Sequence, residues 1–268
     1  MSTTAPTDRP ARTADPTTVA TPGSTAADPI AGDRAAAAVL LAGSLAGLAI
    51  MALHPTGRDA VRNAAAGAPN TRLAVVHTAG ILVQPLLLAA SLALTRRLRA
   101  ASRARAGGAA AMADVAAVGA TAYFTLASVA AVAAAAASGF VAPHVLRHHA
   151  AADAPARATT LAMLDYTGVL NRTFARLDVL FTGAAVLLWS AAMLAHNRGT
   201  PGPSQGSPAR PWSRTLAGFG LLLGAALAIG AGGGYLRMDI HGFGLVVLGQ
   251  GAWLAGVAAH LWRPPRSR

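Results

Sequence analysis

The stretch Leu73–Thr95 reads LAVVHTAGILVQPLLLAASLALT, and RRLRAASRAR follows it directly at positions 96–105. A helix of roughly 20 apolar residues crosses the hydrocarbon core of a bilayer, so this stretch predicts a membrane-spanning helix. Its largest polar side chains are His77 and Gln84, which lie about two helical turns apart and therefore share one helix face. Because an unpaired polar group in hydrocarbon is costly, we expect this face to point into a helix bundle.

The composition of the whole chain agrees with a membrane protein. Of its 268 residues, 54% are hydrophobic and only 12% are charged, and the mean hydropathy is positive, as is typical of polytopic membrane proteins. The formal charge of +12 comes from arginines that cluster at the ends of apolar runs, which indicates membrane topology and contact with anionic headgroups. We therefore expect no nucleic-acid partner. The chain has no cysteine, which excludes disulfides, thiolate metal sites and iron–sulfur clusters.

The pattern of apolar runs predicts an all-α membrane bundle of six helices in the region 35–262. Residues 1–34 are rich in Thr, Pro, Ala and Asp without apolar periodicity, and we interpret them as a disordered tail. Residues 263–268 form a basic C-terminus. We expect the long fourth helix to begin outside the hydrocarbon and to enter it near Asp178. The six predicted spans are about 35–53, 73–95, 112–139, 174–196, 215–236 and 240–262.

The arginines also predict the orientation of the bundle. If the N-terminus is cytoplasmic, the tail, the loops 96–108 and 197–214 and the C-terminus together carry fourteen arginines, against eight on the other side. Cytoplasmic loops of membrane proteins are enriched in Lys and Arg. We therefore expect both termini in the cytoplasm and a multi-pass protein of the plasma (inner) membrane.

With this orientation, histidines gather at the extracytoplasmic ends of four predicted spans. Neutral imidazoles are common ligands of zinc, copper and iron, so four of them at one level predict a metal site. Asp178 or Asp239 would support it as a ligand or by orienting a ring. A haem with two axial histidines is an alternative, although haem ligands usually lie deeper in a bundle. Each histidine is also explained as an amphipathic residue that meets water at a helix end. The candidate ligands are His54, His77, His144 and His241.

A second group of polar side chains lies in the fourth span and its neighbours. Arg172, Arg176 and Asp178 are interpreted either as an ion pair that closes the mouth of the bundle or as part of an anion or proton path, because ionisable groups inside a span are often functional. Gln84 and Gln250 would extend such a polar path.

Glycines recur at spacings of four or seven residues in several spans, for example Gly220 and Gly224, or Gly242, Gly249 and Gly256. Such stripes let a neighbouring backbone approach closely. We interpret them as packing faces, and a membrane-protein partner or a second copy of the chain could use them as well.

Three functions remain open at this stage. The first is a protein with a His-rich metal or haem site at the extracytoplasmic face that acts in electron transfer, metal handling or sensing. The second is a small transporter or channel with a polar path near Asp178. The third is a structural or assembly subunit of a membrane complex. No tight metal motif, nucleophile elbow or phosphate-binding loop favours a particular enzyme reaction.

Overall fold

The computed structural model describes residues 29–55, 71–103, 107–150, 153–198 and 211–263. Within these ranges the chain forms helices and no strand, which confirms the predicted all-α fold. The helices are α1 (Pro29–Leu53), α3 (Thr71–Arg103), α4 (Gly108–Ala136), the π-helix η1 (Ala137–Val141), α5 (Ala142–Ala150), α6 (Ala154–Arg198), α7 (Arg214–Gly232) and α8 (Ile240–Trp262).

The described residues contain six helical stretches that are long and apolar enough to cross a membrane. This confirms the six predicted spans, although several ends differ. Helix α1 begins at Pro29, inside the region predicted to be a disordered tail; the rest of that tail and residues 264–268 lie outside the described residues. Helix α3 continues to Arg103, because Ala, Leu and Arg all favour helix.

The predicted end of the fifth span, near residue 236, is wrong because α7 already stops at Gly232. Gly234 follows with φ of +75°, a left-handed conformation that glycine adopts without steric cost. The turn is closed by the amide of Leu236, which donates to the carbonyl of Gly230 at 2.9 Å. This hydrogen bond satisfies a carbonyl that the last helical turn would otherwise leave unpaired.

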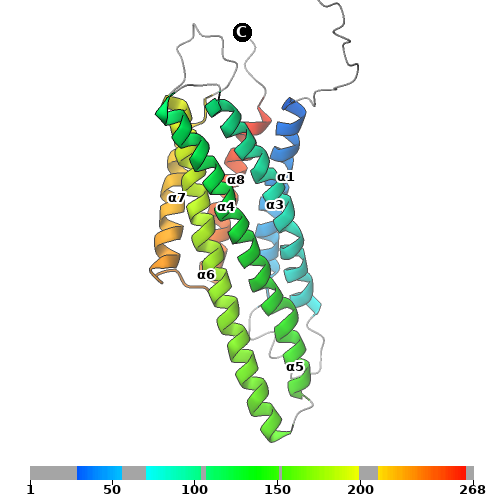
Figure 1. Ribbon diagram of the computed structural model, residues 1–268. Helices are drawn as coiled ribbons and strands as arrows, with labels where there is room; N and C mark the ends of the chain where they lie inside the picture. Colours follow the sequence, from blue (N-terminus) through cyan, green and yellow to red (C-terminus); the bar gives the residue numbers. More distant parts are fainter. Residues whose placement is uncertain (1–28, 56–70, 104–106, 151–152, 199–210, 264–268) are drawn as a thin grey trace, which may run out of the picture.

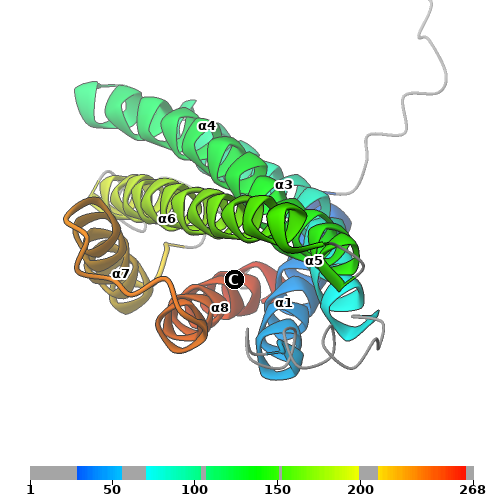
Figure 2. The ribbon, with the colours of Figure 1, turned by 90° about the horizontal axis from the view of Figure 1, so that it is seen from below.

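The six long helices form a closed ring. Helix α3 packs between α1 and α4, α6 packs between α4 and α7, and α8 completes the ring by packing on α1 and α7. Figure 2 shows this order in a view along the bundle.

The two ends of the bundle are built differently (Figure 1). At one end, where α1 begins and α8 finishes, all long helices are present; we call it the termini end. At the other, α5 and the first turns of α6 extend beyond the remaining helices; we call it the hairpin end. With 45 residues, α6 is about 68 Å long, roughly twice the thickness of a bilayer's hydrocarbon core.

The main hydrophobic core fills the termini end. Leu40, Leu94, Met193 and Val257 are buried there together with alanines of α4 and the indole of Trp212. A smaller cluster around Val179 and Leu227 joins α6, α7 and α8 nearer the hairpin end. The centre of the ring at the hairpin end is therefore not filled by the main core.

The glycine stripes serve packing inside this ring, as predicted. A Cβ on Gly224 would lie 2.6 Å from the carbonyl oxygen of Gly183, so α6 and α7 touch through their backbones. On α8, Gly249 and Gly256 receive leucine side chains of α7. Helices of the same chain thus occupy these faces, and a partner docking there would have to displace them.

Candidate functional site

A cavity of about 650 Å³ lies inside the ring, toward the hairpin end. Helices α1, α3, α4, α6 and α8 contribute its walls. On α6, residues at helical spacing form one stripe that faces the cavity: Asn171, Ala175, Asp178, Thr182, Val186 and Trp189. A mostly apolar cavity of this size with a few polar groups is typical of a small-molecule binding site.

Aromatic side chains close the cavity toward the termini end. Trp189 and Trp253 stack with ring centroids 6.1 Å apart, and Phe124 packs on Trp189 at 5.5 Å. Trp189 is 1% exposed and Trp253 is not exposed at all. These rings and the main core behind them separate the cavity from the termini end.

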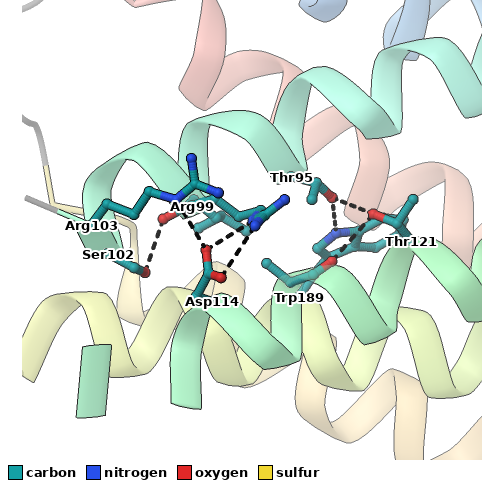
Figure 3. A network of polar contacts seen from close by, with 9 residues as sticks. Thr95, Arg99, Ser102, Arg103, Asp114, Thr121 and Trp189 are labelled. Atoms are coloured by element: carbon teal, nitrogen blue, oxygen red, sulfur yellow. Dashed lines mark hydrogen bonds and ion pairs between the residues drawn. The ribbon is translucent and has the colours of Figure 1, made fainter. Parts of the chain in front are cut away.

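A chain of hydrogen bonds holds Trp189 in place (Figure 3). Its indole N–H donates to the hydroxyl of Thr95 at 2.9 Å, and the hydroxyls of Thr95 and Thr121 lie 2.7 Å apart. Thr121 in turn donates to the carbonyl of Ala117, so Thr95 donates to Thr121. The chain joins α3, α4 and α6 at the floor of the cavity.

Ion pairs lie farther toward the termini end. Arg99 donates to Asp114 from its Nε at 2.8 Å and from a terminal nitrogen at 3.3 Å, linking α3 to α4 (Figure 3). Arg97 of α3 pairs with Asp33 of α1. The arginine-rich end of α3 is thus attached to two neighbouring helices.

Asp178 is the partly buried carboxylate of the cavity wall. It accepts a hydrogen bond from the hydroxyl of Thr182 at 3.3 Å, and none of the ion pairs among the described residues includes it. Asp239 also lies on the wall, but it is already paired: it accepts from the amide of Gly242 at 2.9 Å and forms an ion pair with Arg237 at 2.8 Å.

The ionisable residues that line the cavity are Asp178, Asp239, His54 and His77, and no arginine of the described chain is among them. This is notable in a protein with 22 arginines and ten aspartates. Arg172 and Arg176, which we predicted beside Asp178 in a polar path, are exposed on α6 and do not line the cavity. Neither forms an ion pair with Asp178 in the described part of the chain.

His54 and His77 meet at the hairpin end of the cavity. Their Nε2 atoms lie 3.4 Å apart, and the two rings are nearly perpendicular. His77 is buried, whereas His54 is partly exposed. Gln84 lines the same cavity two turns farther along α3, which confirms that His77 and Gln84 share an inward face.

The other two predicted ligands do not join this pair. His144 is exposed on α5 and contacts His148 edge to face, with ring centroids 4.6 Å apart. His241 is exposed in the first turn of α8, and neither residue lines the cavity. Over the described residues, no group of three or more His, Cys, Asp or Glu side chains is placed to hold a metal ion. The predicted four-histidine site is therefore not formed.

A haem between the two remaining histidines does not fit this geometry. Metal–imidazole bonds are about 2.0–2.1 Å long, so two axial nitrogens on opposite sides of one iron lie about 4 Å apart. The observed separation of 3.4 Å is shorter, and the porphyrin plane would have to pass between the two rings.

Several cavity residues were not predicted as part of a site. Trp189, Trp253, Phe124 and Thr182 were not among the candidate site residues. The side-chain nitrogens of Gln250 and Trp253 are buried without a hydrogen-bond partner among the described residues, and both residues line the cavity. In the sequence, Asp178, Thr182 and Trp189 are spaced so that they share one face of a helix. This spacing could have indicated that Thr182 and Trp189 belong to the same site as Asp178.

Comparisons of the chain with models of known protein families, with curated proteins and with solved structures find no match.

Proposed function

We propose that the protein is a membrane transporter that binds an amphiphilic organic cation in the central cavity. The observation that carries this proposal is the charge of the cavity wall. In a strongly basic protein, no arginine of the described residues lines the wall, and Asp178, which does line it, has no ionic partner among those residues. A ligand cation would supply the missing partner.

The distribution of polar and apolar groups supports an elongated ligand. Asp178 is eleven residues from Trp189 on one helix, about 16 Å along the axis. The cationic group would lie near Asp178, and Gln84 and Gln250 offer further hydrogen bonds along the cavity wall. The apolar part would extend toward Trp189, Trp253 and Phe124, whose rings favour apolar and cationic groups.

The closed floor of the cavity favours a transporter over a channel. Among the described residues, the stacked indoles and the main core close the cavity toward the termini end, so passage requires a rearrangement. Two features of the helices around the cavity suit such a change: Pro85 interrupts the hydrogen bonds of α3, and the π-helix η1 follows α4 directly and interrupts its regular hydrogen bonds. Both are common sites of helix bending. With the orientation predicted from the arginines, the ligand would enter from outside the cell.

Binding of octyltrimethylammonium to purified protein in nanodiscs tests the proposal, with tryptophan fluorescence as the signal and octanol as the neutral control. We expect Asp178→Asn to weaken cation binding about tenfold or more, since a hydrogen bond or contact to a charged group contributes about 1.5–3 kcal/mol. Asp165→Asn removes an exposed carboxylate of the same helix that does not line the cavity and should leave affinity unchanged. Equal affinity of wild type and Asp178→Asn would refute the binding site.

Transport is measured separately in proteoliposomes with labelled octyltrimethylammonium. We expect uptake by the wild type and by Asp165→Asn, and uptake near the protein-free level for Asp178→Asn. Cation binding without uptake would refute the transporter while leaving the binding site intact.

A further inference from the structure

The arrangement of His54 and His77 has a chemical consequence that the organic-cation site does not use. Each ring has its Nδ1 next to a backbone carbonyl: His54 Nδ1 lies 2.9 Å from the carbonyl oxygen of Pro55, and His77 Nδ1 lies 2.7 Å from that of Leu73. A carbonyl oxygen only accepts hydrogen bonds, so both Nδ1 atoms carry the hydrogen.

The two Nε2 atoms of the neutral rings are then both acceptors. They nevertheless lie 3.4 Å apart, at the wall of a cavity. Two lone pairs at this distance repel unless a positive centre lies between them. A histidine whose Nδ1–H is fixed by a backbone carbonyl is also the usual form of a metal ligand that binds through Nε2.

The distance between the two nitrogens distinguishes between kinds of metal geometry. With metal–nitrogen bonds of about 2.0–2.1 Å, two ligands of a tetrahedral ion lie about 3.3–3.4 Å apart, whereas two ligands in a straight line lie about 4 Å apart. The observed 3.4 Å corresponds to one edge of a tetrahedron. The cavity leaves room for water or another ligand at the remaining positions.

The surroundings of His77 fix its position. A Cβ on Gly139 of η1 would overlap the Cβ and Cγ of His77, so the π-helix lies directly on this side chain. His54 follows the last residue of α1, and Arg72 of α3 donates to the carbonyl of Leu53 at 2.9 Å. The ends of α1 and α3 are thereby held together where the two rings meet.

We propose that His54 and His77 form a two-nitrogen binding site for a tetrahedral transition-metal ion of the Zn²⁺ type. Among the described residues no arginine lines the cavity wall, so no described guanidinium competes with a metal ion there. The metal would connect α1 to α3 at the hairpin end. This proposal does not depend on the transport of an organic cation.

Titration of metal-free, full-length protein with Zn²⁺ or Co²⁺ tests the site. The protein is purified through a tag without histidine, and the lack of cysteine removes thiolate competitors. We expect one Co²⁺ per chain with the visible absorption of a tetrahedral ion. His54→Ala and His77→Ala should each weaken binding more than about tenfold, since even loss of an outer-shell partner costs 10–100-fold.

Two further variants separate ligation from packing. His54→Cys keeps a metal ligand at the same place and should retain binding with an altered cobalt spectrum. The double variant His144→Ala, His148→Ala removes an exposed histidine pair and should bind as the wild type does. Binding that survives in His54→Ala, or that disappears in His144→Ala, His148→Ala, would overturn the proposal, as would failure of the wild type to bind either ion. Asp178→Asn should keep the metal site, which distinguishes it from the organic-cation site.

Discussion

At the scale of single residues, Trp189 shows how the floor of the cavity is held. Its indole N–H is buried, and its hydrogen bond goes to Thr95. Thr95→Val keeps the side-chain shape but removes the acceptor, so we expect the free energy of unfolding to fall by about 1–3 kcal/mol. Thr95→Ser retains the hydroxyl and should cost less. Denaturant unfolding in detergent measures both; equal losses would show that the methyl group, not the hydrogen bond, stabilises the floor.

Asp239 gives a prediction for acid pH. Its carboxylate caps α8 by accepting from the amide of Gly242, and this hydrogen bond, with the charge of Arg237, lowers the pKa of Asp239 below its usual value. A carboxyl group with a lowered folded-state pKa stabilises the fold above its unfolded pKa of about 3.9, and this stabilisation is lost as pH falls through the folded pKa.

Asp239→Ala should therefore lower the melting temperature at pH 7. On acidification to pH 3, its melting temperature should fall less than that of the wild type. Asp239→Asn is the matched control, because asparagine also caps helices and only the pairing with exposed Arg237 is lost. Thermal melts of the three proteins from pH 7 to pH 3 measure the difference. The same acid response in Asp239→Ala as in the wild type would contradict the role of the carboxylate.

The sequence could predict the depth of site residues but not their direction around the helix axis. His54, His77, His144 and His241 all lie at helix ends toward the hairpin end, as their positions indicated. Only His54 and His77 point toward each other. His144 and His241 are exposed, since a residue at a helix end can turn outward without burying its polar atoms. For His77, the sequence did indicate the direction of the side chain, because His77 and Gln84 share one helix face and two polar residues on one face favour an inward orientation.

At the scale of helices, the crossing of α6 and α7 depends on glycine. A Cβ on Gly224 would lie 2.6 Å from the carbonyl oxygen of Gly183 and 2.8 Å from the amide of Leu187. Because these are backbone atoms, Gly224→Ala has to separate the two helices. Gly218→Ala, on the same helix, would place its Cβ in open space.

We expect Gly224→Ala to destabilise the protein by about 1–3 kcal/mol through overpacking. Gly218→Ala should be neutral or stabilising by up to about 1 kcal/mol, because alanine favours helix over glycine. Unfolding in detergent measures both variants. A Gly224→Ala protein as stable as Gly218→Ala would show that the helices are not in backbone contact.

The long apolar runs identified all six spans because a bilayer demands length and hydrophobicity from each helix. The sequence did not predict that the π-helix at Ala137–Val141 interrupts the α-helical hydrogen bonds of this span. A π-helix arises from local insertion into a regular helix, and here Gly139 lies against His77, a contact with a residue about sixty positions away in the chain. The sequence of this segment alone, rich in alanine, continues the apolar pattern of α4.

At the scale of the whole molecule, the bundle is asymmetric along its axis. The main hydrophobic core, the hydrogen-bond chain of Trp189 and the ion pairs of Arg97 and Arg99 lie toward the termini end, whereas the cavity, the histidine pair and Asp178 lie toward the hairpin end. A tightly packed half and a hollow half suit a protein that receives a ligand from one side of the membrane. Which side that is depends on the orientation, for which the arginines are the evidence.

The orientation can be measured because the chain has no cysteine. Ala109 is exposed at the start of α4, at the termini end, and Ala158 is exposed near the start of α6, at the hairpin end. Ala109→Cys and Ala158→Cys make matched single-cysteine proteins, since each changes an exposed alanine near a helix start. The excess of arginines at the termini end predicts that this end is cytoplasmic. In intact cells, a membrane-impermeant maleimide should therefore label Ala158→Cys and label Ala109→Cys only after permeabilisation. The reverse pattern would place the cavity on the cytoplasmic side, so that the proposed ligand would be taken from the cytoplasm instead of from outside the cell.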